Sequence, residues 1–152
     1  MRKEIEKFFP LFFFISGWFI LFLRKPSGLL QPQFWAEDGS VWYVNAYTMG
    51  FKSFFLVQDG YFQTSARIAG LLAQFIPLFH VPQLFFILGL SFQVLPAVFF
   101  ISKRSAQLIP QLSVRLFLAV IYLILPNTTE IHGNATNIQW FLALTAFLIV
   151  LK

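Results

Sequence analysis

VPQLFFILGLSFQVLPAVFFIS, residues 81–102, contains no charged side chain and is followed directly by Lys103 and Arg104. At about 1.5 Å per residue a helix of this length extends roughly 33 Å, and the hydrocarbon core of a bilayer is about 30 Å thick. We therefore expect a membrane-spanning helix here, and this expectation sets the class of the whole chain. Pro96 is the clearest interruption deep within the stretch.

The overall composition favours the same class. The chain is 58% hydrophobic and 11% charged, and it contains 22 phenylalanines. A soluble domain of this composition would have too little polar surface to cover its core. Three more apolar runs, residues 5–23, 110–125 and 138–151, are expected to form further spans. We expect an all-α transmembrane protein with about four spans in a single membrane domain, residues 1–152.

The net charge of +5 does not indicate a nucleic-acid ligand. Most basic residues stand in small groups at the ends of apolar runs, where loop charges set membrane orientation. The chain has no cysteine, which excludes disulfides, thiolate metal sites and a cysteine nucleophile. The apolar N-terminal run lacks a small-residue cleavage motif, so we interpret it as an uncleaved first span rather than a signal peptide.

Residues 26–80 form a long first loop in which we expect two short helices. One covers Gly39–Met49, with Asp38 as its N-cap and Gly50 just past its end. The other, Thr64–Phe79, has apolar residues on one face and polar residues on the other, so it either spans the membrane or lies in the interface. The interfacial choice obeys the positive-inside rule better, because it leaves the N-terminus and the basic loop at 103–115 on the cytoplasmic side.

This topology brings two polar loops to the outer side of the membrane. The first contains WAEDGSVW, residues 35–42, where Glu37 and Asp38 supply two of the six acidic residues in the chain. The second is residues 126–137 with Glu130, and Arg67 lies on the polar face of the interfacial helix. Carboxylates beside membrane segments are costly to desolvate, so they usually have a partner or a function. The structural alternatives are an N-cap role for Asp38 and pairing of Glu37 with Lys25 or Arg67.

Three segments, WAEDGSVW, GYFQTSARIAG (residues 60–70) and PNTTEIHGNATNIQW (residues 126–140), resemble bacterial membrane proteins near the O-antigen glucosyltransferase group. The order of spans and loops also resembles the N-terminal part of GT-C fold glycosyltransferases. Those enzymes are polytopic and use polyprenyl-phosphate-linked sugars. Because they generally have many more spans, the resemblance implies that this chain is an N-terminal portion, truncated at its C-terminus and inactive alone.

The resemblance implies a role for each candidate residue. Glu37 or Asp38 would be the general base that takes a proton from the acceptor hydroxyl, and Arg67 would contact the phosphate of the leaving group. Glu130 would be the second catalytic acid. The remaining candidates for substrate contact are Trp35, His132, Asn134, Asn137 and Gln139, although the last three could instead cap the helix that follows.

The expected partners are membrane lipid, a polyprenyl-phosphate sugar donor and a glycan or lipid acceptor, at the bacterial inner membrane with a cytoplasmic N-terminus. Glu130 and His132 alone make a weak metal signal, since at least one more ligand would be needed, so we expect no cofactor. Two other classes stay open. One is a small non-enzymatic membrane protein, or a remnant, that packs with a partner. The other is a transporter or flippase fragment.

Overall fold

The computed structural model describes residues 2–126 and 128–151, with side chains from residue 9 onward. The described part is helical apart from one isolated bridge between Gln58 and Tyr61, which confirms the all-α prediction. The elements are α1 (Arg2–Arg24), α2 (Ser27–Leu30), η1 (Asp38–Tyr43), α3 (Val44–Met49), η2 (Gly50–Phe55), α4 (Thr64–Leu72), η3 (Ala73–Phe75), η4 (Leu78–His80), α5 (Val81–Gln93), α6 (Leu95–Ile101), α7 (Ser105–Leu108), α8 (Leu112–Ile124) and α9 (Ile138–Val150). The basic N-terminal residues Arg2, Lys3 and Lys7 lie outside the described side chains.

The predicted central span is the longest helix of the molecule. Elements η4, α5 and α6 run on as Leu78–Ile101, and the division between α5 and α6 falls just before Pro96. Its side chains at 86, 90, 94, 97 and 101 recur at helical spacing and are buried in one core cluster with residues of α1 and α8. In the described part of the chain this is the one helix long and apolar enough to cross a membrane, with 24 residues.

The other three expected spans are shorter apolar helices. The described apolar stretches are Phe9–Arg24, Leu112–Ile124 and Ile138–Val150. The last two have 13 residues each, or roughly 20 Å of helix, which is less than the hydrocarbon thickness. Their outer faces expose large apolar side chains, including Phe117 and Phe147. The structure thus supports one span by length, and the four-span arrangement stays a prediction.

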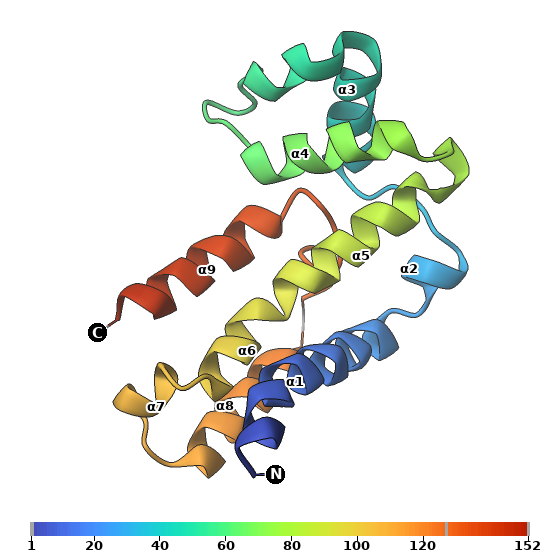
Figure 1. Ribbon diagram of the computed structural model, residues 1–152. Coiled ribbons are helices and arrows are strands. Elements are labelled where there is room, and N and C mark those ends of the chain that lie inside the picture. The colour runs from blue at the N-terminus through green and yellow to red at the C-terminus, as the bar shows by residue number, and fades with distance from the viewer. Residues whose placement is uncertain (1, 127, 152) are drawn as a thin grey trace.

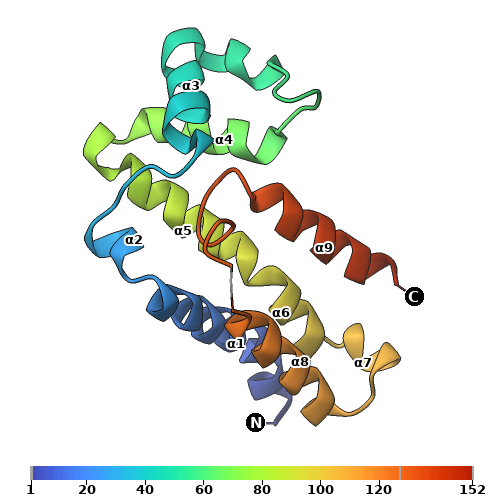
Figure 2. The same cartoon turned by 180° about the vertical axis from the view of Figure 1, so that it is seen from behind.

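The helices form a bundle with a cap at one end (Figures 1 and 2). The long α5–α6 helix lies between α1 and α8 on one side and α9 on the other. Elements α3, η2 and α4 form the cap beyond the first turns of α5, whereas α7 and the N-terminus lie at the opposite end. The cap and the loop that follows α6 therefore lie at opposite ends of the bundle.

Both short helices expected in the first loop are present. Helical residues run from Asp38 to Met49, and Gly50 follows with a positive φ of 55°, as predicted. The second helix, α4, has 9 residues, roughly 14 Å, and the chain then breaks at Pro77. A helix this short cannot cross a hydrocarbon core of about 30 Å, which favours the interfacial interpretation.

Candidate functional site

The loop between α8 and α9, residues 125–137, is tied to the ends of distant helices. The Arg24 guanidinium donates to the carbonyl oxygens of Leu123 and Leu125 at 2.7 and 2.5 Å, and to Thr128 Oγ1 at 2.6 Å. Carbonyls at the end of a helix lack partners within the helix, so Arg24 caps α8. This contact gives the basic residue at the end of α1 a structural role.

A buried hydrogen-bond network fixes the middle of the same loop. His132 Nε2 lies 3.0 Å from the Leu21 carbonyl oxygen, and Gln93 Nε2 lies 3.2 Å from His132 Nδ1. Gln93 Oε1 accepts from the Gly133 N–H at 3.2 Å. The Leu21 carbonyl oxygen can only accept a hydrogen bond, so the His132 ring carries its proton on Nε2. Burial lowers the pKa of His132 to about 4, with help from the Arg24 and Lys25 charges, so the imidazole is neutral.

The loop lies directly on the backbone of α5. A Cβ added to Gly89 would stand 2.4 Å from the Asn134 backbone nitrogen and 2.6 Å from the Gly133 carbonyl carbon. Gly133 itself has a positive φ of 63°, a conformation that side chains other than glycine rarely adopt. Gly89 and Gly133 therefore permit the close contact between this loop and α5.

Asp38 joins the first polar loop to the second. Its carboxylate, only 2% exposed, accepts from the backbone N–H groups of Ala135 and Thr136 at 3.2 and 3.0 Å, and from Thr136 Oγ1 at 3.0 Å. The indole N–H of Trp42 donates to the same Thr136 oxygen at 2.8 Å. The N-cap prediction for Asp38 is wrong, since the helix begins at Asp38 with Glu37 in the N-cap position, and the Asp38 side chain binds a turn 97 residues away instead. Burial raises its pKa to about 6 against these hydrogen bonds, and the Glu37 charge adds to the rise.

Glu37 and Glu130 line one open recess, which we call the acidic recess. Its volume is about 470 Å³, and its walls are Trp35, Ala36, Glu37, Glu130, Ile131, Thr136 and Asn137. Trp35 Nε1 and Asn137 Nδ2 donate to the Glu130 carbonyl oxygen at 3.2 and 3.3 Å, which leaves the Glu130 carboxylate free of these contacts. The two carboxylates that sequence reasoning assigned to different loops are therefore brought to one site.

Arg67 lies elsewhere. Its guanidinium, 1% exposed, is 4.8 Å from the centroid of the Trp42 ring, and its three side-chain nitrogens have no hydrogen-bond partner among the residues that the structure describes. Burial lowers its pKa. Arg67 does not line the acidic recess, and Lys25 lies over the Trp35 ring at 4.7 Å.

The remaining candidates divide into internal and surface positions. Asn134 is buried, and its Oδ1 accepts from the backbone N–H and the side-chain amide of Asn137 at 3.0 and 2.8 Å. Gln139 Nε2 donates to Gln63 Oε1 at 3.1 Å and to Tyr61 Oη at 3.3 Å. Asn134 therefore braces the turn before α9, whereas Gln139 links the start of α9 to the loop before α4.

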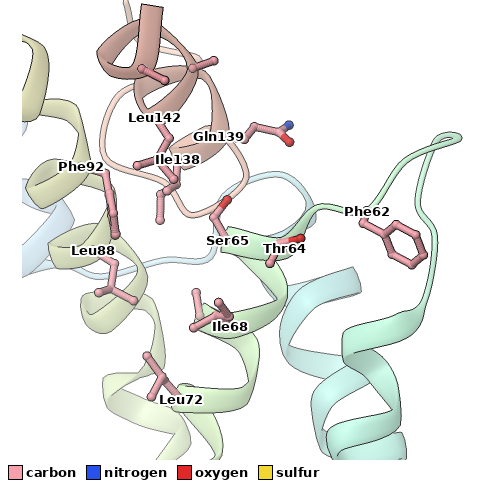
Figure 3. Close-up of a pocket in the computed structure, with 13 residues that line it drawn as sticks. Phe62, Thr64, Ser65, Ile68, Leu72, Leu88, Phe92, Ile138, Gln139 and Leu142 are labelled. Carbon is pink, nitrogen blue, oxygen red and sulfur yellow. The ribbon is translucent and has the colours of Figure 1, made fainter. Parts of the chain in front are cut away.

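Figure 3 shows a second space, the apolar groove, between α4, α5 and α9. Its volume is about 630 Å³, and apolar side chains such as Ile68, Leu88 and Leu142 dominate its walls. Ser65 and Gln139 provide polar atoms beside them (Figure 3). Thr136 and Asn137 line the acidic recess and the next two residues of the chain line the groove, so the two spaces adjoin at the start of α9.

A third space, the polar cavity, lies on the other side of Trp35. It has a volume of about 280 Å³ and is lined by Lys25, Ser27, Gly28, Gln31, Gln33, Phe34, Trp35, Asp38, Pro82, Phe86 and Gly133. Sequence reasoning missed Lys25, Gln31 and Gln33 as candidates. The only signal was the run of amides and aromatic residues directly before the acidic pair.

No group of three or more His, Cys, Asp or Glu side chains that could hold a metal ion is found among the described residues. Comparison of the chain with models of protein families, with curated proteins and with solved structures gives no match. The geometry of the three spaces is therefore the basis of the functional argument.

Proposed function

We propose that this chain is the N-terminal membrane part of a glycosyltransferase. It moves a sugar from a polyprenyl-phosphate donor to a glycan or lipid of the bacterial cell envelope, at the outer face of the inner membrane, with a cytoplasmic N-terminus. The observation that carries the proposal is the acidic recess, where Glu37 and Glu130 from two separate loops line one open space.

Glu37 suits the role of general base better than Asp38 does. Three hydrogen bonds already occupy the Asp38 carboxylate, whereas no hydrogen bond to the Glu37 side chain is found in the described part of the chain. Glu37 is also partly exposed in an open recess, where an acceptor could enter. Asp38 then acts as a positioning residue that holds the two loops together.

The proposed reaction is a single displacement at the anomeric carbon. The acceptor hydroxyl loses its proton to Glu37 as its oxygen attacks, and the bond from the anomeric carbon to the phosphate oxygen breaks. The base must lie about 2.6–3.2 Å from that hydroxyl. The leaving phosphate takes up the bonding electrons, so it needs a cation or hydrogen-bond donors nearby.

The apolar groove can take the lipid chain of such a donor. Its walls are mostly aliphatic and aromatic, and it meets the acidic recess at the start of α9. A lipid lying in the groove would therefore present its phosphate end toward the two carboxylates. The many exposed apolar side chains on α8 and α9 support a membrane environment for this arrangement.

Replacing Glu37 by glutamine is expected to lower sugar transfer at least 100-fold, because general-base catalysis contributes about 10²- to 10⁴-fold. Transfer of radiolabelled sugar from a polyprenyl-phosphate donor is measured in membranes that contain the complete protein of which this chain is proposed to be the N-terminal part. Asp59→Asn is the matched control, since Asp59 is an exposed turn residue with φ 53° outside the recess. Equal loss in both variants, or full activity of Glu37→Gln, would contradict the assignment. No transfer by the unaltered complete protein would favour the non-enzymatic alternative.

The proposed topology predicts which loops are accessible from outside the cell. Single cysteines at Ser40 and Thr129 are expected to react with a membrane-impermeant thiol reagent in intact cells, whereas one at Gln107 is not. All three positions are exposed, and the chain has no cysteine of its own. Labelling of Gln107→Cys without labelling of Thr129→Cys would place Glu130 on the cytoplasmic side and remove the two-loop site.

A further inference from the structure

We infer that the polar cavity binds one sugar ring that carries an anionic group, with Lys25 at the anion and Asp38, Gln31 and Gln33 at the hydroxyls. The choice of a sugar rests on the proposed transfer reaction. The choice of an anion-bearing ligand rests on the cavity itself.

The size of the cavity limits its occupant. Ligand sites commonly measure about 300–1,000 Å³. At about 280 Å³ the polar cavity is at the lower end, so it has room for one small ring and not for an oligosaccharide. Its walls come from the residue after α1, from α2, from the loop before η1 and the first residue of η1, from α5 and from the loop after α8, so several parts of the fold close around it.

Lys25 is the cation that faces this space. Its ammonium group lies 4.7 Å from the centroid of the Trp35 ring, which holds the side chain over the cavity wall. The acidic recess and the apolar groove have no Lys or Arg in their walls. Of the three spaces, the polar cavity alone therefore provides a positive charge for an anionic group.

Asp38 and the side-chain amides of Gln31 and Gln33 provide hydrogen-bond partners for the sugar hydroxyls. A carboxylate offers about four lone-pair sites, and Asp38 uses three of them inside the protein. Oδ2 accepts a single bond, from Ala135, and so keeps one site for a hydroxyl in the cavity. Gln31 and Gln33 add donors and acceptors, and both side chains are exposed enough to reach a ligand.

Trp35 lies between the two polar spaces, because it lines both. A sugar phosphate bound at Lys25 would thus have its ring beside Trp35, and the acidic recess would be on the other side of the indole. The polar cavity is thus a binding site separate from the acidic recess, and Arg67, which is buried against Trp42, lines neither space.

The test is calorimetric titration of the whole chain in neutral detergent with glucose 1-phosphate, glucose and inorganic phosphate at constant ionic strength. Glucose 1-phosphate is expected to bind at least tenfold more tightly than either of the other probes. Lys25→Met is expected to weaken glucose 1-phosphate binding at least tenfold, Lys25→Arg to restore most of it, and Gln33→Leu to weaken it. Lys52→Met is the matched control, since Lys52 is an exposed lysine outside the cavity.

Three outcomes overturn the inference. In the first, none of the probes binds. In the second, Lys25→Met binds glucose 1-phosphate as tightly as the unaltered chain does, and in the third, inorganic phosphate binds as tightly as glucose 1-phosphate. Glu37→Gln separates this inference from the proposed function, because it is expected to keep binding while transfer is lost. Loss of transfer in Glu37→Gln without any probe binding contradicts the cavity alone. Binding by the chain without transfer by the unaltered complete protein contradicts the transferase alone.

Discussion

Replacing Gly89 by alanine is expected to lower the free energy of unfolding by about 4 kcal/mol. The added Cβ would meet backbone atoms of Gly133 and Asn134 at 2.4–2.9 Å. Backbone cannot rotate away as a side chain can, so the loop must leave α5 or α5 must bend. Overpacking alone costs about 1–3 kcal/mol, and a displaced loop also loses buried hydrogen bonds of about 1 kcal/mol each.

The sign of this effect is informative, because alanine normally stabilises a helix relative to glycine by about 1 kcal/mol. Gly17→Ala in α1 is the matched control. There the added Cβ meets the Val94 Cγ2 methyl at 2.6 Å, which belongs to a side chain that can change rotamer. Unfolding in neutral detergent, followed by tryptophan fluorescence, compares the two variants. Equal stability of Gly89→Ala and Gly17→Ala would show that the loop does not rest on α5.

The helical elements could be predicted from the sequence because each depends on local patterns. Apolar runs ended by charges and prolines define α1, α8 and the long helix, and Gly50 ends a segment as expected. The helix predicted over Thr64–Phe79 ends earlier, at Phe75. The long helix begins at Leu78 and not at Val81, because the short η4 continues into α5. Periodicity identifies such elements, but it does not establish how many of them span a membrane.

The site was predicted less completely because its contacts are not local. Asp38 stands at the start of a helix, which suggests an N-cap, yet its partners come from a loop 97 residues away. Arg67 was expected on the polar face of the Thr64–Phe79 helix, but in the structure it is buried against Trp42. The topological argument did bring Glu37 and Glu130 to the same side, and in the structure they line one recess.

Asp38 and His132 are expected to make opposite contributions to the pH dependence of stability. The pKa of Asp38 is raised from 3.8 to about 6, so its contribution is fully present below about pH 4 and is lost as the pH rises through 6. The pKa of His132 is lowered from 6.5 to about 4, so its contribution is present above about pH 6.5 and is lost as the pH falls through 4. At 1.36 kcal/mol per pKa unit, each effect is about 3 kcal/mol.

The two effects should nearly cancel in the unaltered protein between pH 4 and 7, and single variants should separate them. His132→Gln keeps a donor for the Leu21 carbonyl and is expected to become about 3 kcal/mol more stable as the pH falls from 7 to 4, because only Asp38 then titrates. Asp38→Asn is expected to become less stable by a similar amount over the same range. The slope of unfolding free energy against pH is the measurement, since both variants also lose native contacts at every pH. Parallel slopes in the two variants would mean that these buried groups do not control the titration, and that the hydrogen bonds joining the two loops do not form as described.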